Sequence, residues 1–161
     1  MPSSREEWTK YEGHGIRLQH PPDWKPWENP KPLNGVLNWT VNPPDSDEDD
    51  TGVIYISEDS KMKVKPTFDE IVANEKKWPG VRLVNPPKQN NLAIGRCISY
   101  PRESQPGSYL ATLNTHCYRD NGNYVKIWAN IGRYKDNTKP DATSIRNSLI
   151  YERVLNSIEF L

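Results

Sequence analysis

The chain has 161 residues, which is the size of one domain. Its 21 Lys and Arg balance its 21 Asp and Glu, so the formal net charge is zero. Hydrophobic residues make up only 34% of the chain, but 6 Trp and 8 Tyr supply large rings that can build a core. This aromatic content excludes a disordered chain.

The sequence lacks the apolar segments that membrane and secretory proteins carry. Its longest apolar stretch, Val53 to Ile56, is far shorter than the roughly 18 residues that a membrane span needs. The first seven residues are polar and acidic, whereas a secretory leader begins basic and continues apolar. We expect a soluble protein without a membrane span. It is cytoplasmic as the chain stands, or an extracytoplasmic domain if cut from a longer precursor.

The first part of the chain is predicted to form short strands. Residues 1–10 are expected to be a flexible lead. Alternating apolar residues predict strands over 15–20 and 35–41, and a Val-Ile-Tyr-Ile run predicts a third over 52–57. The prolines between residues 21 and 44 remove ladder donors, so they mark strand ends and rigid connections.

A helix is predicted next, over residues 68–78. Thr67 and Glu70 have the spacing of a capping box, and Pro79-Gly80 ends the segment. A short strand over 81–84 follows, and then a strand over 92–100. On one side of that strand every second residue is small, as at Cys97 and Ser99, which indicates that a helix packs close to this side.

The last third predicts a hairpin followed by a helix. Two alternating runs, 109–119 and 123–133, flank Asn121-Gly122, a strong hairpin signal. A two-residue turn there would place Thr115 opposite Trp128. A second helix is expected between 141 and 156, and a short strand or tail over 158–160. The apolar stripe of this second helix comprises Ile145, Leu149, Tyr151, Val154 and Leu155.

Strand runs with two embedded helices predict an α+β fold with a mostly antiparallel sheet. A doubly wound parallel sheet is not expected, because the crossover helices that it needs are absent between the last three strands.

The sequence contains no recognised catalytic motif. The chain has three histidines, and no nucleophile elbow, zinc-protease motif or phosphate-binding loop occurs. His116 and Cys117 are neighbours on a predicted strand, so their side chains point to opposite faces and cannot form a dyad. We therefore expect a protein that is not an enzyme.

The two cysteines lie on predicted neighbouring strands. Cys97 and Cys117 form a disulfide if the strand register sets them opposite each other, and a slip of one residue moves one of them to the far side. Both outcomes stay open.

An acidic segment over residues 45–50 is the most conspicuous chemical feature. Alternating carboxylates suit hard divalent cations such as calcium, although the spacing does not match an EF-hand. The alternative is a solvated loop tip between two strands. No other cofactor is expected. The carboxylates proposed as cation ligands are those of Asp45, Asp47, Asp49 and Asp50.

Basic residues on the late strands stand beside aromatic ones, as Lys126 does beside Trp128. This mixture is typical of platforms that bind single-stranded nucleic acid. The zero net charge argues against that function, because phosphate neutralisation dominates such binding. We expect no nucleic-acid partner.

The order of these motifs resembles the PsbP-like family. The resemblance rests on the opening Gly15-Ile16-Arg17-Leu18 with Pro21-Pro22 and Trp24, the acidic loop, the helix start at Thr67, the Asn121-Gly122 hairpin and the closing segment 154–160. It spans nearly the whole chain, as one PsbP-like domain over residues 1–161. It implies the α/β/α sandwich of the PsbP and Ran-binding-protein superfamily, with a central, mostly antiparallel sheet.

The resemblance also implies a non-enzymatic protein-binding or assembly module, since members of the family are mostly binding or assembly factors. Exposed rings are the candidate anchors for an unidentified protein partner, namely Trp24, Trp27 and Trp78. The alternative for these rings is that they close the core. The alternative function is binding of a small ligand or divalent cation, at the acidic loop or in a cleft between sheet and helix. The oligomeric state stays open.

Overall fold

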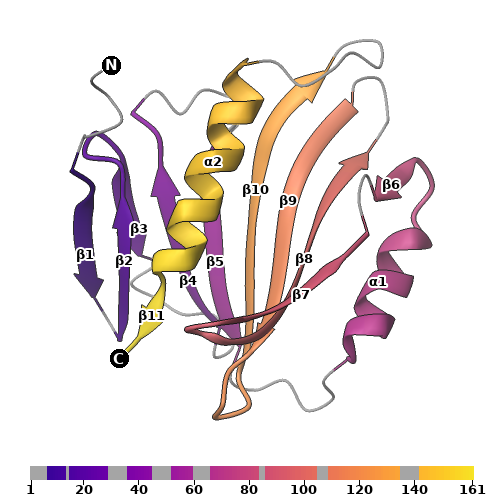
Figure 1. Cartoon of the computed structure of the whole chain (residues 1–161), viewed down its shortest axis with the longest axis horizontal. Coiled ribbons are helices and arrows are strands. Elements are labelled where there is room, and N and C mark those ends of the chain that lie inside the picture. The colour runs from indigo at the N-terminus through magenta and orange to yellow at the C-terminus, as the bar shows by residue number, and fades with distance from the viewer. Residues whose placement is uncertain are drawn as a thin grey trace.

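The computed structural model describes residues 7–13, 15–28, 36–44, 52–59, 66–83, 86–104, 109–134 and 142–161. Within these ranges an eight-stranded sheet has the order β3-β4-β5-β10-β9-β8-β6, with β7 paired to β8 (Figure 1). Its strands are β3 (Lys25–Glu28), β4 (Val36–Asn42), β5 (Ile54–Asp59), β6 (Val81–Leu83), β7 (Lys88–Leu92), β8 (Gly95–Ser104), β9 (Tyr109–Tyr118) and β10 (Tyr124–Tyr134).

A smaller sheet lies beside the main one and has the order β1-β2-β11. Its strands are β1 (Thr9–Gly13), β2 (Ile16–His20) and β11 (Glu159–Phe160). All strand pairs of the described residues are antiparallel. Strand β1 begins inside the lead that we expected over residues 1–10, because Thr9 and Lys10 pair with β2. That expected boundary was wrong.

The helices α1 (Phe68–Lys76) and α2 (Ala142–Ser157) lie on opposite faces of the main sheet. Tyr151 of α2 donates a hydrogen bond to the carbonyl of Ile127 and contacts the Thr115 hydroxyl, each at 2.9 Å. Tyr100 donates to Glu75 of α1 at 2.9 Å. Tyr100 neighbours Ser99, which pairs with Thr115, so the two contacts are on opposite faces. The fold is the expected α/β/α sandwich.

The hydrophobic core fills the space between α2, the smaller sheet and one face of the main sheet. In β2, Ile16 and Leu18 are buried as their alternation predicts. Ser157 of α2 accepts a hydrogen bond from the Gln19 backbone, which holds the helix end against β2. The small residues near Ser99 do face a helix: Ser99 bonds to Thr115, and Thr115 to Tyr151 of α2.

Helix α1 begins where the capping box predicts. The Thr67 hydroxyl accepts a hydrogen bond from the Glu70 backbone at 3.2 Å. The helix ends at Lys76, two residues earlier than expected, and Trp78 therefore lies beyond it. None of the described helices is long and apolar enough to cross a membrane.

In α2 the predicted apolar stripe is confirmed for Tyr151, Val154 and Leu155, which are buried, but not for the first half of the helix. Ile145 and Leu149 are 55% and 63% exposed, whereas Ser144 and Asn147 are buried. This half of the helix faces a bulge in β10 between Asn130 and Gly132. There the Asn147 amide donates to the Ile131 carbonyl at 3.1 Å. A buried polar contact thus takes the place of an apolar one.

The β9–β10 hairpin has a register one residue away from the prediction. Its loop has three residues, Asp120 to Gly122, flanked by the pair Arg119 and Asn123. Gly122 has φ of 89°, the left-handed conformation that follows a type I turn in such loops. Thr115 consequently faces Ile127, and Trp128 points to the opposite face.

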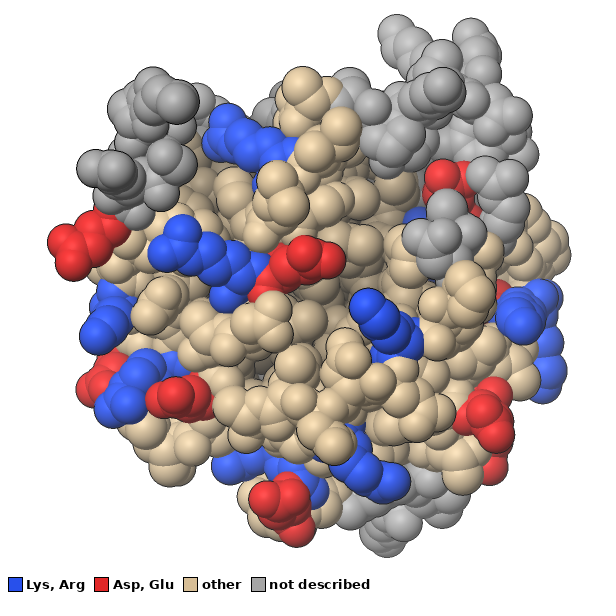
Figure 2. Space-filling view, in the orientation of Figure 1, with Lys and Arg blue, Asp and Glu red and all other residues tan. Residues whose placement is uncertain are grey.

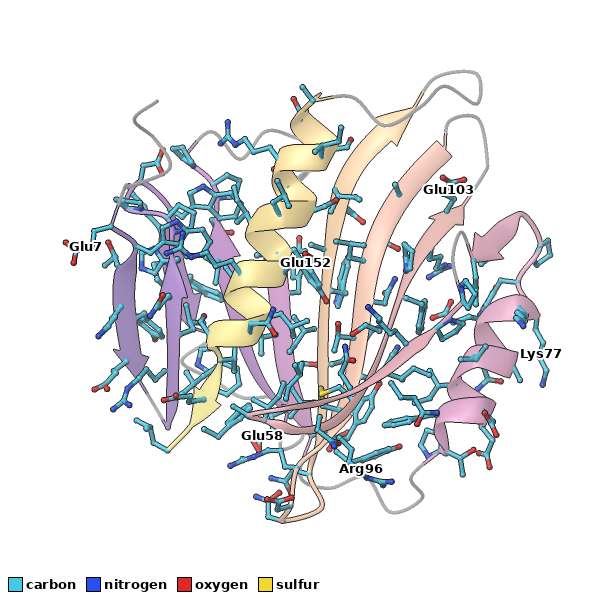
Figure 3. All side chains as sticks on the ribbon, in the orientation of Figure 1. Glu7, Glu58, Lys77, Arg96, Glu103 and Glu152 are labelled. Carbon is cyan, nitrogen blue, oxygen red and sulfur yellow. A yellow bond between two sulfur atoms is a disulfide. The ribbon has the colours of Figure 1, made fainter. Side chains whose placement is uncertain are left out.

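Cys97 and Cys117 pair directly across β8 and β9 and form a disulfide (Figure 3). Both are fully buried in the core cluster that also contains residues of α2 and β2. The register therefore favours the bonded outcome of the two that the sequence left open.

Removing this disulfide should destabilise the fold. The double variant Cys97→Ala/Cys117→Ala should lower the free energy of unfolding by about 3 kcal/mol, because the bond closes a loop with a sequence separation of 20. Denaturant unfolding measures the change. Alkylation of the unfolded protein without reductant, followed by mass spectrometry, is the control. Two alkylated thiols would contradict the bond.

Gly95 should tolerate no side chain. It has φ of +138°, and an added Cβ would lie 2.1 Å from the Tyr118 carbonyl oxygen. Gly95→Ala should cost about 3 kcal/mol from backbone strain plus the clash. The matched control is Gly15→Ala, with φ of +84° but no atom within 4 Å, which should cost about 1 kcal/mol. Thermal or denaturant unfolding compares the two, and equal losses would contradict the clash.

Candidate binding face

The face of the main sheet opposite α2 carries a row of side chains that crosses the sheet from edge strand β3 to β8. The pairings of neighbouring strands place these residues side by side on that one face. In order across the sheet the row is Trp27, Thr40, Tyr55, Trp128, Asn114 and Tyr100. Helix α1 sits at the Tyr100 end, so the β3 end is covered by neither of the described helices.

Aromatic rings dominate the uncovered end. The Trp27 side chain is 52% exposed. Tyr55 and Trp128 are half-buried and stack on each other, with ring centroids 4.3 Å apart and planes 12° apart. The Lys126 ammonium lies 5.9 Å from the centre of the Trp128 ring, a cation–π contact. We call this set the open face and define it as Trp27, Thr40, Tyr55, Lys126 and Trp128.

The covered end holds a hydrogen-bond network centred on His116. Tyr100 donates its one hydroxyl proton to Glu75, and its oxygen lies 2.8 Å from His116 Nε2. His116 Nε2 must therefore carry the ring proton and donate to Tyr100. His116 Nδ1 is then the acceptor for the Tyr124 hydroxyl. Both ring nitrogens are occupied, and the side chain is 5% exposed.

The electrostatics of this network keep it neutral apart from one ion pair and Lys126. Burial, and next the charge of Lys126, lower the pKa of His116 to about 4. Burial also raises the pKa of Tyr100 and of Tyr124, so both phenols stay protonated. Arg102 neutralises Glu75 at 3.3 Å. With both nitrogens bonded, His116 connects Tyr124 of β10 to Tyr100, which in turn bonds Glu75 of α1.

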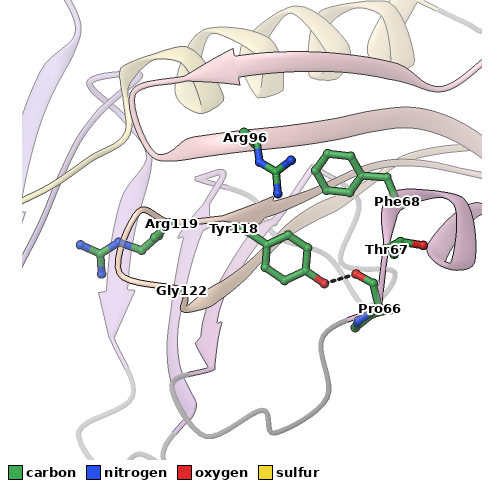
Figure 4. A pocket seen from close by; sticks show the side chains of 7 residues that line it. All are labelled: Pro66, Thr67, Phe68, Arg96, Tyr118, Arg119 and Gly122. Carbon is green, nitrogen blue, oxygen red and sulfur yellow. Dashed lines mark hydrogen bonds between the residues drawn. The ribbon is translucent and has the colours of Figure 1, made fainter.

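A pocket of about 410 Å³ opens beside the start of α1, on the same face of the sheet (Figure 4). The Arg96 guanidinium lies over the Phe68 ring at 5.8 Å, and Phe68 stacks on Tyr118 with centroids 5.9 Å apart. Tyr118 donates its hydroxyl proton to the Pro66 carbonyl. Residues that line the pocket are Pro66, Thr67, Phe68, Arg96, Tyr118, Arg119 and Gly122.

The three tryptophans predicted as anchors have different positions. Trp24 is 3% exposed and belongs to the core. The prediction that it is an exposed anchor was wrong, and the alternative that its ring closes the core is correct. Trp27 lies on the open face. Trp78 is 65% exposed beyond the end of α1, and nothing in the described chain brings it to the open face. For Trp27 and Trp78, partner binding stays a prediction.

The predicted cation ligands Asp45, Asp47, Asp49 and Asp50 lie outside the described residues. Among the residues that are described, no three His, Cys, Asp or Glu side chains come together as a metal site.

The sequence did not predict that Tyr55 and Trp128 stack on the face opposite α2. The expected register paired Trp128 with Thr115, whereas the structure pairs Thr115 with Ile127 and sends Trp128 to the other face. The alternation of Tyr124, Lys126 and Trp128 predicts that these three side chains share one face of the strand. Only the correct register shows which face of the sheet that is.

The low pKa of His116 predicts a pH-dependent stability. The unfolded imidazole binds a proton near pH 6.5 and the folded one near 4, so the free energy of unfolding should fall as pH drops from about 6.5 to about 4. His116 contributes about 3 kcal/mol of this loss. Unfolding curves of the wild type and His116→Gln measure it, since the variant should lose less stability over this range. An NMR titration placing the His116 pKa near 6.5 would contradict the prediction.

Comparison with known proteins supports the fold. No protein-family model and no curated protein matches the sequence. The structure is similar to the solution structure of cyanobacterial PsbP (CyanoP) from Synechocystis sp. PCC 6803, with a TM-score of 0.51 and 11% sequence identity. The match covers 100% of this chain and 96% of that one. At this identity the likeness concerns the fold alone, and the chain has a PsbP-like fold.

Proposed function

We propose that this chain is a non-enzymatic protein-binding or assembly module that docks a protein partner on its open face. The observation that carries the proposal is the cross-strand row: a solvent-exposed Trp27 and the stacked pair Tyr55 and Trp128, with Thr40 between them, on a part of the sheet that neither described helix covers.

Physical considerations favour a protein as the occupant. Interface hot spots are rich in Trp and Tyr, because these rings bury a large area and lose few rotatable bonds on binding. Here the rings stand on paired strands, and Tyr55 and Trp128 already hold each other in place. The entropy lost on docking is therefore small. The family that the sequence resembles, composed mostly of binding and assembly factors, agrees with this function.

The net charge of the chain argues against nucleic acid as the partner. The 21 Lys and Arg are balanced by 21 Asp and Glu, whereas phosphate neutralisation dominates nucleic-acid binding. On the α2 side of the molecule, which is opposite the open face, basic and acidic side chains are interspersed without a patch of one sign (Figure 2). On the open-face side of the sheet, Arg102 is paired with Glu75.

The disulfide supports an extracytoplasmic location. Disulfides persist in oxidising compartments and are rare in the cytosol. Of the two locations left open by the sequence, we favour the extracytoplasmic one, where the buried Cys97–Cys117 bond is stable.

Site-specific photocrosslinking tests the docking surface. The purified chain carries a benzophenone amino acid at Tyr55 and is irradiated in native extract. We expect one dominant protein adduct, and no such adduct when the crosslinker replaces Lys10, which is exposed on β1. Equal adducts from both positions, or none from Tyr55, would contradict the proposal.

Once the adduct identifies the partner, truncation of Trp27 measures its contribution. Trp27→Ala should weaken binding about 30-fold, the effect of losing a hot spot worth about 2 kcal/mol. Leu149→Ala is the matched control, since Leu149 is exposed on α2 at the opposite face and should leave affinity unchanged. Titration calorimetry of the purified pair compares the variants.

A further inference from the structure

The pocket beside α1 combines one cationic group with two aromatic walls. The Arg96 side chain is exposed and lies over Phe68, and the Tyr118 ring lies beneath it (Figure 4). Tyr118 donates its hydroxyl proton to the Pro66 carbonyl, so its ring can contact a ligand but its hydroxyl cannot donate a hydrogen bond to one. The Arg96 guanidinium is then the charged donor of the pocket, with a planar fork that matches a carboxylate.

The charges of the residues around the pocket favour a ligand with a single negative charge. Among the described residues that line the pocket there is no Asp or Glu. Arg119 also lines the pocket, but its guanidinium is paired with Glu58 and points away from Arg96. Arg96 has no ion pair with any described residue. Glu70 is close enough to raise the pKa of Tyr118, second to burial, so its negative charge disfavours a dianion.

The pocket and the open face lie on the same face of the sheet. Arg96, Tyr118 and Tyr124 share a cross-strand row, and Tyr124, Lys126 and Trp128 alternate along β10 on the same face. Four residues of strand separate Tyr124 from Trp128, or about 13 Å. An extended segment of four or five residues spans this distance, with Lys126 midway.

We propose that the pocket binds the terminal carboxylate of a peptide whose last residue is apolar, with the carboxylate on Arg96 and the apolar side chain against Phe68 and Tyr118. The preceding residues of that peptide run past Lys126 toward Trp128. This inference rests on the proposed function, because the peptide is the C-terminal segment of the docked protein.

The test uses small probes that need no knowledge of the partner. Backbone NMR shifts of the labelled chain are followed with N-acetyl-phenylalanine, its uncharged amide and inorganic phosphate. We expect saturable shifts around Phe68, Arg96 and Tyr118 with the acid, and at least tenfold weaker binding of the amide and of phosphate. Amide binding equal to that of the acid, or tighter binding of phosphate, would overturn the proposal.

Two variants locate the binding. Arg96→Gln should weaken binding of N-acetyl-phenylalanine at least tenfold. Arg146→Gln, at an exposed position on α2, should leave this binding unchanged. Unaltered affinity in Arg96→Gln would refute the site. The amide spectra of each variant report folding in the same experiment. If the acid does not bind but a specific adduct forms at Tyr55, only the carboxylate-pocket proposal is refuted. If the acid binds but no specific adduct forms at Tyr55, only the docking-face proposal is refuted.

Discussion

The register of the β9–β10 hairpin is the constraint on which both faces of the main sheet depend. Gly122 in the left-handed conformation closes a three-residue loop, and that loop sets Thr115 opposite Ile127. Those two residues can then receive Tyr151 of α2. The same register sends His116, Lys126 and Trp128 to the other face. A single turn thus separates the packed face from the face that carries the network and the aromatic row.

Much of the fold could be predicted from local patterns, and the exceptions share a physical cause. Alternation identified β2, and the Thr67–Glu70 capping box identified the start of α1, because both signals are local. The helical stripe failed at Ile145 and Leu149, since a bulge in a distant strand offers a carbonyl that Asn147 satisfies. A buried backbone acceptor outweighs an exposed apolar side chain in this case, and no local pattern reports it.

The candidate site was less predictable than the fold. Trp24 and Trp27 are three residues apart in the sequence, and yet one ring closes the core and the other is exposed. Their difference follows from β3 pairing with β4, which the proline-rich sequence did not reveal. The His116 network draws on α1, β8, β9 and β10, so only the assembled sheet brings its members together.

The two ends of this face use aromatic side chains in different ways, and the difference bears on function. Beneath α1, Tyr100 and Tyr124 have their hydroxyls bonded to groups of this same chain, so they contribute to stability. At the β3 end, the Trp27 ring is half exposed, and Tyr55 and Trp128 stack on each other. Stability alone does not require a large apolar ring in solvent at an edge strand, where it invites association. The exposed ring at this edge is therefore the feature on which the docking proposal depends.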